Sequence, residues 1–302
     1  MSIPYFDCHC DTISRCMETG GELRENAFHI DLMRLSEFSP SAQVFSICTE
    51  TLSDPIGKAS HWLKNLKDQL NKNSDIVKLC LNFNDIISAE KSNKIAALIS
   101  IEGAEQISSL QAVYDEGVRI VHITWNYDNA LCGAGLGNGS GLTVKGNDFV
   151  REAQKLGILL DMSHISEAGF WDVMSIIDKP VIAGHSNSRS LCNHKRNLTD
   201  EQFIALIKCG GGAGINLYPY FLENGRNIDS IISHIEHFMS LGGEKSVFLG
   251  CDFDGIEITP TVISGVEDIP KLYEGLLKLN YSESIVRDIF YYNIRGIMEK
   301  VL

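Results

Sequence analysis

Short runs of apolar residues alternate along the chain with stretches in which apolar residues recur at helical spacing. Eight runs have the length and composition of β-strands, over 3–8, 43–47, 96–101, 119–124, 158–162, 181–183, 213–217 and 247–251. Helices are predicted over 61–70, 147–155, 167–177, 199–208 and 227–241, and a helical tail over 268–302 breaks near Asn280. This alternation is typical of an α/β protein, a (β/α)8 or TIM barrel, with a doubly wound open sheet as the competing fold.

The chain of 302 residues contains no repeat, no low-complexity tract and no linker rich in Pro, Gly or Ser. We therefore expect residues 1–302 to form one barrel domain with C-terminal helices. The longest apolar run falls short of the roughly 18 residues that a membrane span needs. Neither a secretory signal nor a lipidation motif is recognisable, so the sequence predicts a cytoplasmic protein without a membrane partner.

Charge and cysteine content narrow the function further. The formal net charge is -13, and the absence of a basic run argues against a nucleic-acid partner. The nine cysteines include no C-x-x-C pair, which favours reduced, buried thiols. Two glycine-rich stretches, 133–141 and 210–214, lack the strand–turn–helix context of a dinucleotide-binding motif. We interpret the first as an active-site loop and the second as a turn.

Polar side chains follow five of the predicted strands, at the end where barrel enzymes place their functional residues. These residues are His9 with Asp11, Glu102, His164, His185 and Asp252. Each one alone could be an ordinary loop residue or helix cap, but together they offer imidazole and carboxylate groups, the ligands that zinc prefers. Asp254, which precedes a glycine, is interpreted as a turn residue.

The first strand carries its polar residues at every second position. In an extended strand Asp7, His9 and Asp11 would face one side, with Cys8 and Cys10 on the other. We expect His9 and Asp11 to bind metal, Asp7 to support them and the two cysteines to face away. The remaining histidines are interpreted as structural, with the last two on an exposed helix face: His29, His61, His122, His194, His234 and His237.

Six segments of the chain together resemble the membrane (renal-type) dipeptidase family of dinuclear zinc peptidases. They read D-C-H-C-D at 7–11, S-I-E-G at 100–103, L-D-M-S-H-I-S at 160–166, V-I-A-G-H-S at 181–186, K-R-N at 195–197 and G-C-D-F-D-G at 250–255. Their order and spacing match the family from Asp7 to Arg295. Since the disulfide and anchor signals of the extracellular mammalian members are missing, the chain resembles a bacterial-type cytoplasmic member.

The resemblance implies two zinc ions per chain and a role for each matching residue. His9 and Asp11 match the ligands of one ion, and His164 and His185 match those of the other. Glu102 matches the carboxylate that bridges both ions, Asp252 the acid/base residue, and Arg196 the cation that receives the substrate carboxylate. The family cleaves dipeptides, often tolerates a D residue at the C-terminal position, and forms homodimers. In one respect the chain departs from the family, because Trp125 replaces a substrate-contacting histidine after the fourth strand.

The implied chemistry is metal-assisted hydrolysis of a dipeptide. Two cations lower the pKa of a bridging water from 15.7 toward about 7, and the resulting hydroxide attacks the scissile carbonyl. Two alternatives stay open at this point. One is another dinuclear barrel amidohydrolase or lactonase, although such enzymes usually carry a carboxylated lysine where this chain has Glu102. The other is a barrel that binds metal or peptide without turnover, which the change at Trp125 leaves open.

Overall fold

Eight parallel strands close into a barrel in the computed structural model, which describes residues 2–49, 53–222 and 227–302. The strands are β1 (Tyr5–Cys10), β2 (Ser41–Ile47), β4 (Ile95–Glu102), β5 (Val118–His122), β6 (Leu159–Asp161), β7 (Ile182–Ala183), β8 (Gly212–Ile215) and β9 (Val247–Leu249). Each strand pairs with the next around the ring, and pairing of β2 with β4 closes it. The predicted (β/α)8 barrel is therefore confirmed, and the open sheet is excluded.

One strand escaped the sequence analysis. β3 (Val77–Leu79) is three residues long and pairs with the first residues of β4, whereas β5 pairs with the last residues of the same strand. Lys78 stands in the middle of this short run, so its sequence carries no recognisable strand pattern. β3 lies outside the barrel ring and leaves the predicted count of eight barrel strands unchanged.

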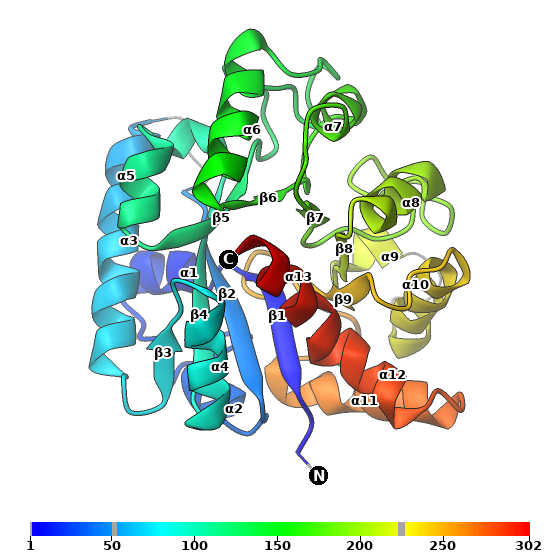
Figure 1. The fold of residues 1–302 in the computed structure, drawn as a ribbon. Coiled ribbons are helices and arrows are strands. Elements are labelled where there is room, and N and C mark those ends of the chain that lie inside the picture. Colours follow the sequence, from blue (N-terminus) through cyan, green and yellow to red (C-terminus); the bar gives the residue numbers. More distant parts are fainter. Residues whose placement is uncertain (1, 50–52, 223–226) are drawn as a thin grey trace.

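Helices surround the barrel between its strands (Figure 1). They are α1 (Thr12–Thr19), α2 (Leu32–Leu35), α3 (Pro55–Lys72), α4 (Phe83–Lys91), α5 (Leu110–Asp115), α6 (Val144–Leu156), α7 (Glu167–Met174), α8 (Asp200–Lys208), α9 (Pro219–Leu222), α10 (Ile228–Ser240), α11 (Ile269–Lys278), α12 (Glu283–Arg287) and α13 (Asn293–Val301). All the helices predicted from spacing are present. Thr199 caps α8 in a reciprocal capping box with Gln202, and the predicted break near Asn280 separates α11 from α12.

The barrel interior is filled by apolar side chains from successive strands, including Phe6, Ala42, Leu98 and Phe248. The same core cluster contains side chains of the last helices: Tyr291, Ile294, Ile297 and Met298. In Figure 1 the C-terminus and α13 accordingly lie across one end of the barrel. Because α13 contacts β1 and β9 and fills this end, the carboxyl ends of the strands are left to form a site.

Three glycines allow the backbones of neighbouring strands to approach closely on one side of the barrel. A Cβ on Gly214 or Gly250 would collide with the carbonyl oxygen of Gly184. The 210–214 stretch is therefore partly a strand rather than a turn, since β8 begins at Gly212. Its glycines serve the packing of β7, β8 and β9.

Among the described residues, no helix has both the length and the apolar composition required to cross a membrane.

The interpretation of His234 as an exposed helix residue is wrong. Its side chain on α10 is fully buried, where Nδ1 accepts the N–H of Ser188 at 3.1 Å and Nε2 lies 3.1 Å from the carbonyl oxygen of Leu222. Burial lowers the pKa of His234 to about 4. Its neighbour His237 is partly exposed and pairs with Asp200 at 2.8 Å. Helical spacing did not reveal that Ser188 and Leu222, from two other segments, lie against this face of α10.

We expect His234 to make folding stability fall in mild acid. The unfolded chain takes up a proton near pH 6.5, whereas the folded chain resists protonation down to about pH 4, so stability is lost as the pH falls between these values. At pH 5 this contribution to the free energy of unfolding is about 2 kcal/mol smaller than at pH 7.5. Urea unfolding of the wild type and His234→Gln at both pH values measures it, because glutamine can keep both hydrogen bonds without titrating. An equal pH dependence in the two proteins would contradict the assignment.

Candidate metal centre

The end of β1 differs from an ideal strand. The register of β1 against β2 shifts between Asp7 and Cys10, so the side chains beyond Asp7 no longer alternate strictly between two faces. Cys8 belongs to the core cluster that fills the barrel, whereas Cys10 belongs to a second cluster, which includes side chains of the surrounding helices such as Leu66 and Phe238. The prediction that Asp7, His9 and Asp11 share one face, with both cysteines opposite, is therefore wrong. His9 and Asp11 nevertheless meet, with Nε2 and Oδ2 3.2 Å apart.

Asp7 lies behind this pair and contacts the backbone. Its Oδ1 accepts the N–H of Cys251 at 2.7 Å and the N–H of His9 at 3.3 Å. Its Oδ2 accepts the hydroxyl of Tyr5 at 3.1 Å. These bonds link the end of β1 to the segment just before Asp252, so Asp7 fixes the backbone that carries two predicted site residues.

Glu102 occupies the centre of the site at the end of β4. Its Oε1 lies 2.9 Å from Nε2 of His164 and 3.3 Å from Nε2 of His185. Its Oε2 lies 3.6 Å from Nε2 of His9. One oxygen of the carboxylate thus faces the imidazoles of His164 and His185, and the other faces that of His9. Gly103 follows with a φ of 103°, a conformation that glycine adopts at little cost.

His164 and His185 follow β6 and β7, and their Nε2 atoms are 2.9 Å apart. The Nδ1 of His164 lies 2.9 Å from Oδ1 of Asn126, which orients the ring. His164 has a φ of 69°, in the left-handed region that favours glycine. In the folded chain His164 keeps this uncommon backbone conformation, and its imidazole faces Glu102.

Asp252 follows β9 and lines the same cavity as Glu102 and His164. Its Oδ2 accepts the side-chain N–H of Asn216 at 2.9 Å, and its Oδ1 lies 3.9 Å from Nε2 of His9. Its φ is 62°, again in the left-handed region. Burial raises the pKa of Asp252 to about 7, with His9 opposing and Asp11 and Glu102 adding to the rise.

Arg196 and Trp125 line the same cavity as Glu102, His164 and Asp252, and this cavity has a volume of about 390 Å³. Arg196 is 5% exposed, and its Nη2 has no hydrogen-bond partner among the described residues. A buried guanidinium without a partner is costly, so this cation is suited to an anionic ligand. Leu136 also lines the cavity, which agrees with the interpretation of 133–141 as a loop at the site.

The charge states of Glu102, His164 and His185 suit metal binding. Burial would raise the pKa of Glu102, but His9, His164 and His185 outweigh it and hold the pKa well below its usual value. Burial lowers the pKa of His164 to about 3, with Arg196 adding to the fall, and burial also lowers that of His185. These two imidazoles are therefore neutral and Glu102 is ionised near pH 7, which are the protonation states that metal ligands require.

The residues present fit a metal ion. The ligand atoms of His9, Asp11 and Asp252 all lie within 4.8 Å of one another, and so do those of His9, Glu102, His122 and His185. Oδ1 of Asp11 and Nδ1 of His185 are buried without a hydrogen-bond partner among the described atoms. Converging nitrogen and oxygen atoms with unsatisfied lone pairs are the donor set of zinc and related ions.

His122, which was interpreted from the sequence as structural, lies inside the candidate site. Its ring is fully buried at the end of β5 and packs against the rings of His9 and His185, with centroid distances of 5.2 and 5.4 Å. His122 is thus a component of the site that sequence reasoning missed. Asn126 and Asn216 were missed as well. Their place in the sequence could have indicated a role in the site, because Asn126 lies just after the predicted strand 119–124 and Asn216 lies near the end of the predicted strand 213–217.

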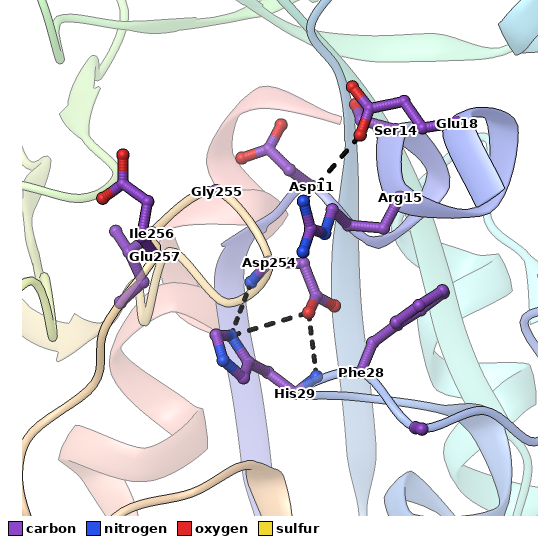
Figure 2. Close-up of a pocket in the computed structure, with 11 residues that line it drawn as sticks. Asp11, Ser14, Arg15, Glu18, Phe28, His29, Asp254, Gly255, Ile256 and Glu257 are labelled. Atoms are coloured by element: carbon purple, nitrogen blue, oxygen red, sulfur yellow. Dashed lines mark hydrogen bonds and ion pairs between the residues drawn. The ribbon is translucent and has the colours of Figure 1, made fainter.

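Asp254 lies outside the group of ligands, as its interpretation as a turn residue predicts. Figure 2 shows its contacts with His29, where Oδ1 accepts the N–H of His29 at 2.8 Å and the Asp254 N–H is donated to Nδ1 of His29 at 3.0 Å. Its Oδ2 accepts the hydroxyl of Thr12 at 2.6 Å. Asp254 therefore fastens the loop after β9 to the segments that follow β1.

Comparisons with known proteins place these observations in a family. A family model described as membrane dipeptidase (peptidase family M19) matches residues 1–302. A Klebsiella pneumoniae protein, described as an uncharacterized protein in the pqqA 5' region, is 32% identical over 266 residues, which cover 82% of this chain and 97% of that protein.

Solved structures share the fold over the whole chain. A Rhodobacter sphaeroides metallo peptidase, crystallised with a phosphinate mimic of the dipeptide L-Ala-D-Ala, has a TM-score of 0.90 and 25% identity, and all of both chains is covered. The dipeptidase AC, a metallo peptidase of family M19, has a TM-score of 0.89 and 24% identity, covering 100% of this chain and 99% of that one. At its level of identity the second likeness shows the fold alone.

Proposed function

The chain belongs to the membrane dipeptidase family, peptidase family M19, a family of metallo-dipeptidases, and on that premise we propose that it hydrolyses dipeptides at a centre of two zinc ions. His9 and Asp11 would hold one ion, His164 and His185 the other, and Glu102 would bridge them. The observation that carries the proposal is that Glu102, His164, Arg196 and Asp252 line a single cavity. Bound zinc supplies Lewis-acid polarisation of a carbonyl and lowers the pKa of bound water.

In this proposal Asp252 moves the proton during hydrolysis. Its Oδ1 would take a proton from the attacking water and pass it to the leaving amine. Asn216 holds Oδ2 by its N–H at 2.9 Å and so keeps the other oxygen directed toward His9. Because the pKa of Asp252 is raised to about 7, the carboxylate can both accept and release a proton near neutral pH.

Arg196 would bind the C-terminal carboxylate of the dipeptide through paired N–H groups, as guanidinium and carboxylate commonly do. This contact would limit substrates to short peptides, because the carboxylate must reach a buried cation that lines a cavity of about 390 Å³. Trp125 lines the same cavity and would contribute an apolar surface to substrate binding. The L-Ala-D-Ala mimic bound by the Rhodobacter enzyme supports tolerance of a C-terminal D residue.

A panel of L,L and L,D dipeptides, assayed with added zinc, tests the proposed function. We expect hydrolysis of dipeptides and none of cyclic amides, lactones or phosphotriesters. Turnover of the cyclic or phosphotriester substrates alone would favour another barrel amidohydrolase or lactonase. Binding of zinc and dipeptide without turnover of any substrate would favour a non-catalytic barrel.

Replacing Arg196 with Gln should selectively weaken binding of substrates that have a free C-terminal carboxylate. Loss of charge-assisted hydrogen bonds worth about 1.5–3 kcal/mol should raise KM roughly 10–150-fold. The matched control is the corresponding dipeptide amide, which lacks the carboxylate. We expect the wild type to prefer the free acid and Arg196→Gln to lose that preference. If the variant retains the wild-type ratio of KM values for acid and amide, Arg196 does not bind the carboxylate.

A further inference from the structure

Three neighbouring strands place a row of ionisable side chains at one level of the barrel. Glu102, His122 and Asp161 are register partners at the ends of β4, β5 and β6, and all three are buried. Nδ1 of His122 lies 3.7 Å from Oε1 of Glu102, and its Nε2 lies 3.4 Å from Oδ2 of Asp161. The imidazole therefore stands between two carboxylates, one of which is the centre of the metal site.

The position of His122 calls for an explanation beyond packing. Neither of its ring nitrogens has a hydrogen-bond partner among the described residues, and the same holds for Oδ2 of Asp161. Each buried polar group without a partner costs about 1–3 kcal/mol. An apolar residue would fill this place at lower cost if His122 served packing alone. Its two nitrogens instead face the two carboxylates of the row.

Asp161 is fixed by the backbone of both histidine-bearing segments. Its Oδ1 accepts the N–H groups of Ser163 and Gly184, each at 2.8 Å. These residues immediately precede His164 and His185. The hydroxyl of Ser163 in turn accepts the N–H of His185 at 3.1 Å. Asp161 thus offers a rigid support for the ring of His122.

We propose that His122, which stands between Asp161 and Glu102, is a positioning residue that keeps Glu102 where the ligand histidines converge. The inference rests on the metal centre of the proposed function, but not on its substrate. Removal of the partners that orient metal ligands typically weakens metal binding by roughly 10–100-fold. His122 acts through Glu102 in this account and does not itself bind the ion.

Zinc affinity, measured by competition with a chromophoric chelator in the absence of substrate, tests the inference. We expect His122→Leu to weaken binding of at least one zinc ion by roughly 10–100-fold, and His122→Asn, which keeps an N–H donor, to recover most of the loss. The matched control is His234→Leu, which removes an equally buried imidazole away from the site and should keep wild-type affinity. Saturation with cobalt should give His122→Leu the wild-type visible spectrum, because no ligand atom is lost.

Wild-type zinc affinity in His122→Leu would overturn the inference, as would an equal loss in His234→Leu. A changed cobalt spectrum would overturn it in another way, because His122 would then be a ligand. If His122→Leu does not fold, Asp161→Asn carries the same expectation, since it keeps an oxygen for Ser163 and Gly184 while removing the acceptor that faces His122. A wild type that binds zinc yet cleaves no dipeptide would refute the proposed function and leave this inference standing, whereas a wild type that binds no zinc would refute both.

Discussion

Glu102→Gln should empty the metal centre and abolish hydrolysis. Glu102 faces His164, His185 and His9 at 2.9, 3.3 and 3.6 Å, so one carboxylate serves both halves of the site. The amide of glutamine carries no charge, and its NH2 group cannot donate an electron pair to a cation. Zinc affinity should therefore fall by more than the roughly 10–100-fold that follows from removing an outer partner. Metal per chain after dialysis and kcat/KM for the best dipeptide measure the two effects.

The matched control is Glu105→Gln, the same substitution three residues later. Glu105 lies in a single turn of 3-10 helix over Ala104–Gln106, where its Oε2 accepts the side-chain N–H of Asn129 at 2.9 Å. It faces none of the ligand histidines within ion-pair distance among the described residues. This control should keep both metal and activity. Full metal content and wild-type activity in Glu102→Gln would show that Glu102 is not a metal ligand.

Asp252→Asn should leave the zinc content unchanged and lower kcat by roughly 10²–10⁴-fold, the usual effect of losing a general acid–base group. Asparagine is isosteric and can still accept the N–H of Asn216, but it cannot take a proton from water. Since Arg196, not Asp252, would bind the substrate carboxylate, KM should change much less than kcat. Steady-state kinetics together with metal analysis of the same preparation test both expectations.

Asp254→Asn is the control for this substitution, two residues along the same turn. Asp254 binds Thr12 and His29 instead of facing the ligands, so its replacement should lower the melting temperature and leave kcat near the wild-type value. Wild-type kcat in Asp252→Asn would exclude Asp252 from the chemistry. Parallel loss of zinc and kcat would instead make Asp252 a ligand, consistent with its proximity to His9 and Asp11.

Much of the candidate site could be predicted from local patterns. An apolar run followed by His, Asp or Glu is visible in the sequence, and in a parallel barrel every such run ends at the same rim. For this reason Glu102, His164, His185 and Asp252, predicted from separate segments, lie together in the structure. Arg196 and Trp125 have no such pattern, and they were predicted through the resemblance to a family.

The residues that were missed or misplaced depend on register and on distant segments. His122 follows the strand pattern of β5, but pairing with Glu102 on one side and Asp161 on the other decides that its ring faces the metal centre. The shift in register after Asp7 upset the expected alternation along β1. His234 looked exposed because helical spacing cannot show which other segment packs on a helix face.

The sequence by itself determined the barrel, the order of its strands and most of the residues at its open rim, because hydrophobic periodicity is a local property of the chain. Tertiary structure decided which of these side chains meet, and at what distance. Closing the ring fixes the register of each strand against its neighbours, and a change of one residue in register would redirect every side chain on that strand. The row of Glu102, His122 and Asp161 exists because three separate segments share one register.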